Sequence, residues 1–390
     1  MSVNQNSKSR KHHHRVVLTG GGTGGHVYPA LSVYEQLVKE PSVAEVLYIG
    51  AVGHLEERLC AERDIAFAGL KVSGMPRRPG LSLLRWPFEM TLAIVEARRL
   101  LGRFDPTVVL GTGGYASAAP LAAGLHLGVP IAVHEPDAYP GLVNKLFAQS
   151  ASLVSLGMEG ASSRIGSGIL KPVVNGNPIR ASFSGTSREE ALHALSLDSG
   201  RRTLAFTGGS QGAKAINDSV RDMLVELLDR YPDLQVIHQA GGQNLAELQS
   251  SLPETLKGPR YQGRYLLRDY FPDMALVYSA SDLVVARAGA MTIAELTACG
   301  LPSVFIPYPY AAQNHQMHNA RYLESRGGAR VISQDGLSSA VLLKELSSLL
   351  DDKERMAQMA AIMKGMGRPR AAEDLAYQLL RLSSKYLGLD

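Results

Sequence analysis

The chain has 390 residues, 45% of them hydrophobic, which is enough for two domains with a sizeable core in each. Its 40 basic and 36 acidic side chains leave a formal charge of only +4, so the overall charge gives no support to nucleic-acid binding. Two cysteines, Cys60 and Cys299, show neither a metal-ligand spacing nor a disulfide framework, which is typical of a reducing compartment.

The first residues of the chain predict a disordered tail over residues 1–14. Residues Met1–Lys11 are polar, and His12, His13 and His14 follow without an acidic or cysteine partner, so we expect a solvated tail and no metal there. The tail lacks the apolar core of a signal peptide, and no apolar run in the chain is long enough to span a bilayer.

Short β-branched runs alternate with helical patterns along the chain, and this predicts parallel sheets covered on both faces. The first set of predicted strands is Arg15–Leu18, Val46–Ile49, Thr107–Leu110, Ile131–Val133 and Leu153–Leu156. The second set is Thr203–Phe206, Gln235–His238, Leu283–Ala286, Ser303–Ile306 and Arg330–Ile332. Helices predicted between and after them include Ala30–Val38, Ala213–Leu228 and about Arg370–Leu387.

The pattern of strand, glycine-rich turn and helix occurs twice, about half a chain apart. "LTGGGTGGH" follows the first strand, and "FTGGSQGAKAIN" begins at the end of the sixth. Two doubly wound domains account for this repeat, joined by the Gly-, Pro- and Ser-rich segment Asn175–Ser187. The predicted domains are residues 15–178 and 179–369, with a C-terminal helix at about 370–390 that packs back on the first domain.

The first glycine-rich loop has the Gly20-x-Gly22-x-x-Gly25 spacing of a dinucleotide-binding fingerprint. That fingerprint also requires an acidic residue at the end of the next strand, and "YIGAVGH" has none there, because Glu56 and Glu57 come too late. The loop therefore favours close approach of an anion or polar ligand to amides at a helix N-terminus. A tight turn without a ligand is the alternative.

The second glycine-rich loop, Gly208–Gly212, offers amides and the Ser210 hydroxyl to a phosphate. Farther on, the small residues Ala288–Ala290 let a ligand reach the start of another helix. Thr292 and Glu295 stand in capping-box register, so Glu295 either caps this helix or binds the two hydroxyls of a ribose.

Two further polar clusters are candidates for ligand contacts. The stretch "YAAQNHQMHNA" brings together amides and a histidine that could bind sugar hydroxyls; the alternative is a solvated loop. Its polar residues are Gln313, Asn314, His315, Gln316 and Asn319. "VHEPDAYPGLVNKLFA" follows a strand end, and ligands of open α/β folds bind at such ends. Its polar residues are His134, Glu135, Asp137 and Asn144. The loop Gly111–Tyr115 lies at a comparable strand end.

The segment Gly74–Arg103 combines basic and large apolar residues and contains the only tryptophan. Its basic residues are Arg77, Arg78, Arg85, Arg98, Arg99 and Arg103, and its apolar ones include Leu83, Leu84, Trp86 and Phe88. Such a segment either lies in an anionic membrane interface or is an amphipathic core helix with a charged outer face.

Taken together, these motifs closely resemble the MurG family, the peripheral membrane N-acetylglucosaminyltransferases of bacterial peptidoglycan synthesis. The resemblance runs from about Val16 to Ile332 and rests on the order of "GGTGGH", "GGY", "HE", "GNPIR", "GGSQGA", "ELTACGLP" and "NHQ". It implies the GT-B architecture, with two Rossmann-like doubly wound domains facing an interdomain cleft. It also implies inverting transfer of N-acetylglucosamine from UDP-GlcNAc to the muramoyl C4 hydroxyl of lipid I, which gives lipid II, without a metal or cofactor.

The resemblance also implies an organisation and partners. The first domain would bind the acceptor and the membrane, and the second would bind UDP-GlcNAc. The partners would be UDP-GlcNAc, lipid I, an anionic membrane surface and other cell-wall synthesis proteins, with no nucleic acid. The protein would sit at the cytoplasmic face of the bacterial plasma membrane.

The residues that match the family's motifs take roles from it. His26 is the first candidate for the base that the acceptor hydroxyl requires, and Asp137 and Glu135 compete with it. The implied donor-binding residues are Thr23, Gly24, Gly25, Asp137, Arg180, Ser210, Phe271, Arg287, Ala290, Met291, Thr292, Ile293, Ala294, Glu295, His315 and Gln316. The implied acceptor and membrane residues are Tyr115, Asn144, Arg77, Arg78, Arg85 and Trp86.

Two positions depart from the family's usual pattern. Many members have Asn where this chain has Asp137, and many have Gln where it has His315. Three other functions stay open: a GT-B transferase that glycosylates a diacyl lipid, a non-hydrolysing UDP-GlcNAc epimerase, and a nucleotide-sugar-binding protein without enzymatic activity. A transfer assay with a lipid I analogue separates these alternatives.

Overall fold

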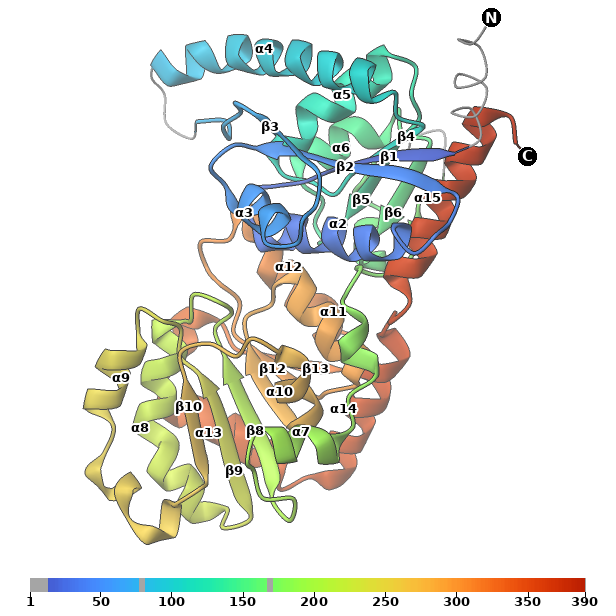
Figure 1. Cartoon of the computed structure of the whole chain (residues 1–390). Coiled ribbons are helices and arrows are strands. Elements are labelled where there is room, and N and C mark those ends of the chain that lie inside the picture. Colours follow the sequence, from blue (N-terminus) through green and yellow to red (C-terminus); the bar gives the residue numbers. More distant parts are fainter. Residues whose placement is uncertain (1–12, 77–80, 167–170, 390) are drawn as a thin grey trace, which may run out of the picture. The chain divides into compact units, whose positions relative to one another are not determined.

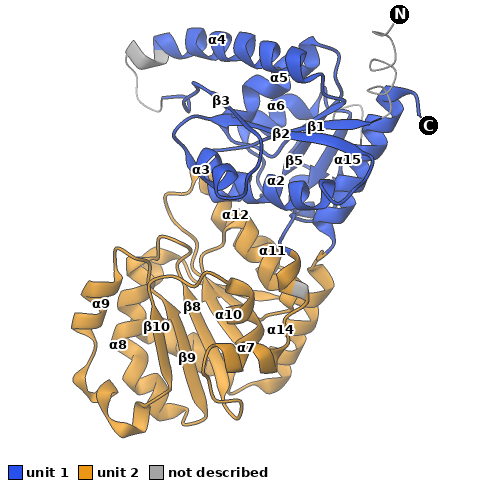
Figure 2. Cartoon of the chain, in the orientation of Figure 1, with its two compact units in different colours: residues 1–180, 370–390 blue, residues 181–369 orange. Residues whose placement is uncertain are grey.

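The computed structural model describes residues 13–76, 81–166 and 171–389, which form two compact units (Figures 1 and 2). Unit 1 consists of Met1–Arg180 and Arg370–Asp390, and unit 2 of Ala181–Pro369. The chain thus leaves unit 1 after Arg180 and returns to it at Arg370.

Unit 1 has a seven-stranded parallel sheet in the order β3-β2-β1-β4-β5-β6-β7. The strands are β1 (His14–Thr19), β2 (Val43–Ala51), β3 (Phe67–Leu70), β4 (Val108–Gly111), β5 (Ile131–Glu135), β6 (Leu153–Leu156) and β7 (Val173–Val174). The helices are α2 (Gly24–Leu37), α3 (Leu55–Ala61), α4 (Leu81–Phe104), α5 (Ala118–His126), α6 (Leu142–Ala148) and α15 (Ala371–Leu387).

Unit 2 has a six-stranded parallel sheet in the order β10-β9-β8-β11-β12-β13. The strands are β8 (Arg202–Thr207), β9 (Leu234–Gln239), β10 (Tyr265–Arg268), β11 (Leu283–Ala286), β12 (Ser303–Phe305) and β13 (Ala329–Val331). The helices are α7 (Arg188–Ala194), α8 (Lys214–Arg230), α9 (Leu245–Ser251), α10 (Met274–Ala280), α11 (Ala290–Cys299), α12 (His315–Glu324), α13 (Ser339–Leu350) and α14 (Lys353–Met366).

Both sheets follow the doubly wound order, in which the chain first moves from the central strand to one edge and then returns to build the other side. This confirms the predicted pair of Rossmann-like α/β folds. The central strands carry apolar side chains on both faces, because consecutive side chains of a strand point to opposite sides. In β1, Val17 packs in one cluster with Leu101 of α4, and Val16 packs in another with Val27 of α2.

Helix α15 covers part of the same face of unit 1 as α2. Its Leu375 and Leu379 are buried in the cluster that contains Val16. Polar contacts fix it as well: Ser383 Oγ lies 2.7 Å from His14 Nδ1, and Gln378 exchanges two amide hydrogen bonds with Asn175, of 2.9 and 3.0 Å.

His14 differs from its prediction as part of a solvated tail. It is the first residue of β1, its side chain is buried, and its backbone N–H donates to the Ser42 carbonyl over 2.9 Å. The contact with Ser383 explains the difference, because that partner lies at the other end of the chain. Most of the predicted tail lies outside the described residues.

Helix α8 corresponds to the predicted helix Ala213–Leu228, and Ile216, Val220 and Leu224 are among its fully buried residues. Three strands were not predicted: β3, β7 and β10. All three lie at sheet edges; β3 and β10 are mostly half-buried, and β7 has only two residues, both exposed. Short edge strands with few buried residues give a weak apolar pattern, and this explains why all three were missed.

The docking of α15 should contribute substantially to the stability of unit 1. Replacement Leu379→Ala removes a fully buried side chain, and we expect a loss of about 2–5 kcal/mol in the free energy of unfolding. The matched control is Tyr377→Ala on the same helix, where the side chain is 63% exposed. Urea unfolding followed by emission of Trp86, the single tryptophan, reports on unit 1. Equal unfolding midpoints for the two variants would contradict the packing role of α15.

Candidate active site

In each unit, the polar candidates gather where the central strands end. Ligands of doubly wound sheets bind beyond the carboxyl ends of the strands, at the point where the strand order reverses. In unit 1 this point lies between β1 and β4, and in unit 2 it lies between β8 and β11. A glycine-rich loop follows the first strand of each pair.

Part of the first glycine-rich loop is explained by the protein's own packing. A Cβ atom at Gly20 would come within 2.0 Å of Thr112 Oγ1, and one at Gly21 within 2.2 Å of Glu56 Oε1. Glu56 is buried and accepts hydrogen bonds from Ala51 N and, at 3.4 Å, from Gly22 N. These two glycines therefore allow the loop to lie against neighbouring side chains and need no ligand to explain them.

Gly24 and Gly25 have a different environment. They are the first two residues of α2, which begins six residues before the predicted start at Ala30. A Cβ atom at Gly25 would meet only Thr23 Oγ1, at 3.6 Å. Thr23 is the N-cap residue, but its side chain makes no capping hydrogen bond. The His26 N–H donates to the Thr23 carbonyl over 3.1 Å, whereas the preceding amides, of Gly24 and Gly25, have no intrahelical acceptor and can bind an anion or hydroxyl.

His26 occupies the first turn of α2 and is oriented by the loop. Its Nδ1 atom lies 3.2 Å from the Gly21 carbonyl oxygen and 3.3 Å from Thr23 Oγ1. A carbonyl oxygen only accepts, so the contact with Gly21 favours the neutral tautomer that carries its proton on Nδ1. In this tautomer the proton-accepting lone pair is on Nε2. That atom lies close to Gly113, where a Cβ atom would come within 3.2 Å of it. The loop thus fixes the orientation of the ring, and a neutral ring in this orientation is suited to act as a general base.

Glu135 is buried and holds the loop after β5 together. Its Oε1 accepts from Asp137 N at 2.9 Å, and its Oε2 accepts from Gly141 N at 2.9 Å and Asn144 Nδ2 at 2.8 Å. Burial, with the nearby Asp137 charge, raises the pKa of Glu135 to about 7. Both carboxylate oxygens are engaged by the loop, so the geometry favours an organising role over proton transfer to a substrate. Asp137, in contrast, is only half-buried.

The structure brings His26 and Asn144 together. A Cβ atom built on Gly113 would lie 2.9 Å from His26 Cδ2 and 3.0 Å from Asn144 Nδ2. Tyr115 lies beside the same loop, because a Cβ at Gly22 would come within 3.1 Å of its ring. The predicted acceptor residues Tyr115 and Asn144 thus share one strand-end edge with His26.

His134 does not join them as a ligand-binding residue. Its ring is buried between Ser155 Oγ and Asn177 Oδ1, each 3.0 Å from a ring nitrogen. Burial lowers the pKa of His134 to about 4, so it is neutral at pH 7. Asn177, from the "GNPIR" motif, also donates to the Pro136 carbonyl over 3.0 Å. His134 and Asn177 therefore position the loop that carries Asp137.

In unit 2, the loop Gly208–Gly212 exposes Ser210 at its tip. Gly212 has φ +71°, and a Cβ atom there would lie 1.8 Å from the Ala240 carbonyl oxygen. The loop is thus pressed against the chain that follows β9, and only glycine fits at this position. Phe271, predicted to hold a base through its backbone, is buried, and its N–H donates to Gln239 Oε1 over 3.0 Å.

The start of α11 differs from the capping-box interpretation. The helix begins at Ala290, and its N-cap residue is Gly289, so Thr292 is the third helical residue and does not cap the helix. Ala290, Met291 and Thr292 form a first turn without a side-chain cap, and Ile293 is buried. Ala294 and Glu295 are half-buried on the next turn. The capping box, which was the alternative for Glu295, is therefore not formed, and the ribose contact stays its predicted role.

The amide cluster before α12 divides into ligand-facing candidates and structural residues. His315 and Gln316 are the first residues of α12, and Asn314, the N-cap residue, makes no side-chain capping bond. Gln316 Oε1 accepts from Tyr308 N at 3.0 Å. Asn319 is fully buried, and its amide donates to the Ala288 carbonyl over 3.2 Å. Asn319 therefore fixes the chain before α11 and does not face a sugar.

Arg287 also has a structural environment. Its guanidinium donates to the Ile306 and Pro307 carbonyls at 2.9 and 3.1 Å and to Gln334 Oε1 at 2.6 Å. Burial lowers its pKa, and the ring of Tyr308 lies 5.5 Å away. These contacts hold the chain that follows β12, so in this structure Arg287 supports the loops at this strand-end edge of unit 2.

The other predicted site residues lie at several places. Arg180 is the half-buried last residue of unit 1 before the chain enters unit 2. Arg85 is exposed on α4, whereas the Trp86 indole donates to the Ser73 carbonyl over 3.1 Å. Arg77 and Arg78 lie outside the described residues. Within the described ranges, no group of three or more His, Cys, Asp or Glu side chains could hold a metal ion.

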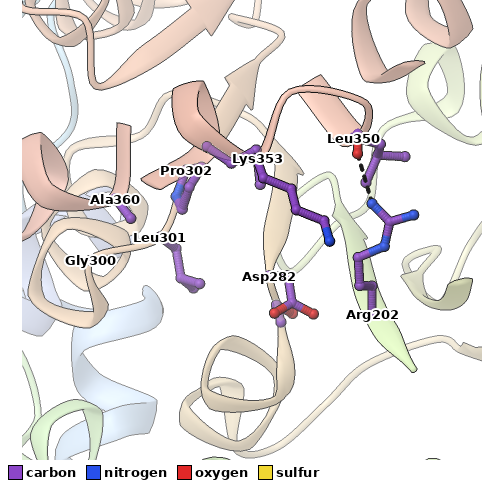
Figure 3. Close-up of a pocket in the computed structure, with 10 residues that line it drawn as sticks. Arg202, Asp282, Gly300, Leu301, Pro302, Leu350, Lys353 and Ala360 are labelled. Atoms are coloured by element: carbon purple, nitrogen blue, oxygen red, sulfur yellow. Dashed lines mark hydrogen bonds between the residues drawn. The ribbon is translucent and has the colours of Figure 1, made fainter. Parts of the chain in front are cut away.

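One cavity of unit 2 lies away from the glycine-rich loop. This cavity of about 380 Å³ lies where β8, β11 and β12 begin, and Arg202, Asp282, Leu301 and Lys353 line it (Figure 3). Asp282 accepts from Arg188 and from Thr203 N, and Arg202 donates to the Leu350 carbonyl over 2.8 Å. These contacts join the ends of strands and helices, and the cavity lies at the edge of the sheet opposite the glycine-rich loop.

Comparison with known proteins agrees with this geometry. Residues 16–155 match the glycosyltransferase family 28 N-terminal domain, and residues 203–375 match the C-terminal domain of the same family. A transferase from Halothermothrix orenii is 39% identical over 93% of this chain and 97% of its own length. One from Listeria monocytogenes is 36% identical over 94% and 99%. Both are named UDP-N-acetylglucosamine–N-acetylmuramyl-(pentapeptide) pyrophosphoryl-undecaprenol N-acetylglucosamine transferases.

Solved structures show the same architecture. MurG of Acinetobacter baumannii is 25% identical, with a TM-score of 0.74 over 94% of this chain and 99% of its own. A UDP-GlcNAc 2-epimerase from Neisseria meningitidis shares the fold alone, with 15% identity and a TM-score of 0.65 over 94% of this chain and 100% of its own. This chain therefore belongs to the MurG family of N-acetylglucosamine transferases, with GT-B architecture, because both family 28 domains match it and its relatives match over nearly their full length.

Proposed function

We propose that the chain transfers N-acetylglucosamine from UDP-GlcNAc to the muramoyl C4 hydroxyl of lipid I and so forms lipid II. The observation that carries this proposal is the placement of His26 in a chain of this family: its ring lies in the first turn of α2, with Nδ1 3.2 Å from the Gly21 carbonyl oxygen. Direct displacement at the anomeric carbon inverts the linkage. It requires a base for the acceptor hydroxyl and a neutralising environment for the departing diphosphate.

The donor is assigned to unit 2. The exposed Ser210 and the loop amides would contact the diphosphate, and the positive end of the α11 helix dipole would face it as well. Glu295 would bind the ribose hydroxyls. His315 and Gln316, at the uncapped start of α12, would contact the sugar.

The acceptor is assigned to unit 1. His26 Nε2 would take the proton of the C4 hydroxyl, while Tyr115 and Asn144 would position the acceptor near it. Thr23, Gly24 and Gly25 would supply a hydroxyl and helix N-terminal amides to the reacting groups. Asp137, which replaces a common Asn, would place a partly exposed carboxylate at the same edge. Glu135 would keep that loop in place through its three hydrogen bonds.

Replacement His26→Ala tests this assignment. With a lipid I analogue as acceptor and labelled UDP-GlcNAc as donor, we expect kcat to fall roughly 10²- to 10⁴-fold, because the hydroxyl proton loses its acceptor. The dissociation constant for UDP should change less than about threefold, since the base does not bind the nucleotide. The readouts are initial rates of labelled product formation and UDP binding by calorimetry.

The control for this experiment is His126→Ala, which removes an exposed histidine at the end of α5. It should keep wild-type kcat. Near-wild-type turnover of His26→Ala would remove His26 from catalysis. Release of free sugar or of its epimer by the wild-type protein, without a labelled lipid product, would contradict the proposed transferase function itself.

We also propose that α4 docks unit 1 on the membrane that carries the lipid acceptor, at its cytoplasmic face. Apolar side chains recur along one side of this helix, and all are well exposed: Leu84 (78%), Phe88 (67%), Leu92 (54%) and Val95 (43%). Within the described residues, no helix is long and apolar enough to cross a bilayer. An interfacial helix that presents such a stripe instead lies flat against the headgroup region.

Basic residues accompany the stripe, and α4 uses its other side for the core. Arg85, Arg98, Arg99 and Arg103 are exposed on the helix, while Ala93, Ala97 and Leu101 pack in the core of unit 1. The two interpretations of this segment therefore describe opposite sides of one helix. Trp86 contacts Ser73, and a Cβ at the adjacent Gly74 would touch the Tyr115 ring at 3.4 Å. The start of α4 thus adjoins the candidate acceptor edge.

The double replacement Leu84→Ser and Phe88→Ser should weaken binding to anionic phospholipid vesicles about tenfold or more, because two apolar side chains no longer enter the interface. Vesicle co-sedimentation measures this effect. Val38→Ser with Val341→Ser, which also alters two exposed apolar residues, serves as the control and should bind as the wild type does. Unchanged vesicle binding of the α4 variant would rule out the stripe as the docking surface.

A further inference from the structure

Gln239, the last residue of β9, connects two separate loops of the unit 2 edge. Its side chain is buried, and its Nε2 donates to the Gly209 carbonyl at 3.0 Å and to Thr207 Oγ1 at 3.3 Å. Its Oε1 accepts from Phe271 N at 3.0 Å. One amide therefore ties the glycine-rich loop after β8 to the turn after β10.

These bonds fix the orientation of two peptide groups. In a planar trans peptide, the C=O and the following N–H point in opposite directions. The Gly209 carbonyl points toward Gln239, so the N–H of Ser210 points away from it. In the same way, the Phe271 N–H points toward Gln239, so the carbonyl of Tyr270 points away. Gln239 thereby turns one donor and one acceptor of the backbone away from the interior.

The chemistry of these two groups matches the two ends of a uridine diphosphate. An N–H beside the exposed Ser210 suits a phosphate oxygen, which only accepts. A backbone carbonyl suits the N3–H of uracil, which donates, and does not suit the N3 of cytosine, which accepts. Both Gln239 contacts have the length of ordinary hydrogen bonds, so each peptide group is held in its orientation before a ligand arrives.

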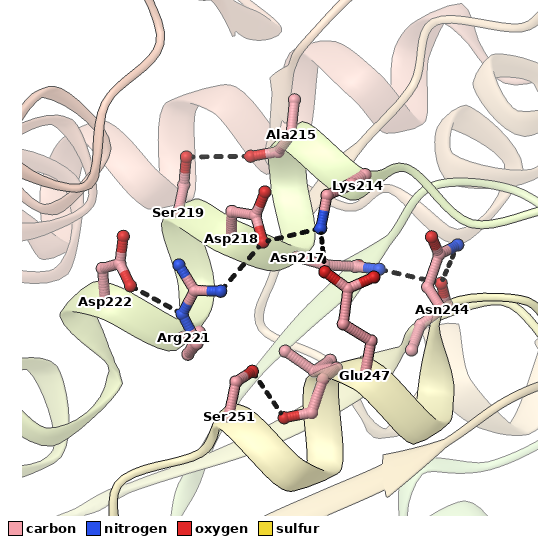
Figure 4. A network of polar contacts seen from close by, with 12 residues as sticks. Lys214, Ala215, Asn217, Asp218, Ser219, Arg221, Asp222, Asn244, Glu247 and Ser251 are labelled. Carbon is pink, nitrogen blue, oxygen red and sulfur yellow. Dashed lines mark hydrogen bonds and ion pairs between the residues drawn. The ribbon is translucent and has the colours of Figure 1, made fainter.

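A polar network keeps the end of β9 in place. Asn217 and Asn244 lie side by side here (Figure 4), and the Nδ2 atoms of both donate to the Ala240 carbonyl, at 2.9 and 3.1 Å. Asn244 also donates to the Gln211 carbonyl over 3.2 Å. Asn217 Oδ1 lies 3.0 Å from Nε2 of the buried His238. Burial lowers the pKa of His238 to about 3, so this ring is neutral and the network carries no buried charge.

We propose that Gln239 is a positioning residue for the donor: it orients the Ser210 N–H for the diphosphate and the Tyr270 carbonyl for the uracil N3–H. This inference rests on the assignment of UDP-GlcNAc to the unit 2 edge. Gln239 itself does not touch the donor. It acts through the two peptide groups, so its loss should affect nucleotide binding more than the chemical step.

The test is Gln239→Glu, which keeps the size of the side chain but places an oxygen against the Gly209 carbonyl. We expect KM for UDP-GlcNAc and the dissociation constant for UDP to rise about tenfold or more, because the loop must reorient. The KM for a lipid I analogue and kcat at saturating donor should change less than about threefold. The preference for UDP over CDP in competition should also fall, which a general loss of stability would not cause.

Gln235→Glu is the matched control. Gln235 is buried on the same strand, and its amide makes three similar hydrogen bonds, to Asp198 N, the Asp198 carbonyl and Thr203 Oγ1, at the other end of β9. Gln235→Glu should lower the thermal stability about as much as Gln239→Glu does, but it should leave KM for UDP-GlcNAc unchanged. Equal donor KM values for the two variants would overturn the inference.

Glu295→Gln separates that outcome from failure of the donor assignment. If Glu295→Gln weakens UDP binding and Gln239→Glu does not, the donor lies at this edge and only the role of Gln239 is wrong. If neither replacement affects UDP binding, the assignment of the donor to this edge is itself wrong. Weaker UDP binding by both variants, with Gln235→Glu like the wild type, supports the proposal.

Discussion

Burial of the central strands on both faces is the constraint on which the rest of each unit depends. Val16, Val17 and Leu18 of β1 are fully buried, as are Leu204 and Phe206 of β8. Such strands leave no room for polar chemistry along their length, so the polar groups collect beyond their carboxyl ends. There the chain must turn sharply against its neighbours, and glycines at Gly20, Gly21 and Gly212 permit contacts that a Cβ atom would block.

The candidate ligand-binding helices lack a side-chain N-cap, as do α3, α5, α6, α9 and α15, whereas four helices of unit 2 have one. Helices α7, α10, α13 and α14 have N-caps whose side chains accept from the first turn: Ser187, Asp273, Ser338 and Asp352. Helices α2, α8, α11 and α12 follow the glycine-rich or small-residue loops and have no such cap. A side-chain cap would occupy amides that a diphosphate or a sugar hydroxyl could use. The proposed donor and acceptor sites therefore share one physical principle.

Much of the fold could be predicted from the sequence, because buried parallel strands carry a strong apolar signal. The limits of β6 and β11 were predicted as they occur, and the repeated glycine-rich turn indicated two sheets of one type. The edge strands β3 and β10 were missed, because half-buried strands leave a weaker pattern. The start of α2 was misplaced, because glycines hide the helical periodicity over its first turn.

The site was less predictable, since a sequence pattern shows which polar residues are near a strand end but not which partner satisfies each one. His134 and Asn319 looked like ligand contacts, yet each makes hydrogen bonds inside the fold. Glu135 looked like a competing base, yet its oxygens hold a loop. Gln239 gave no signal at all, because a single glutamine at the end of an apolar strand acquires meaning only when its partners in two distant loops are known.

The central claim is that the strand-end loops of unit 2 bind the nucleotide of the donor. Backbone hydrogen exchange, measured by mass spectrometry with and without saturating UDP, tests it most directly. The account predicts slower exchange in peptides that contain Ser210, Phe271 and the first turn of α11, with little change around Lys353 at the opposite edge of the sheet. Protection confined to that opposite edge or to unit 1, with unchanged exchange in the three loops, would contradict it.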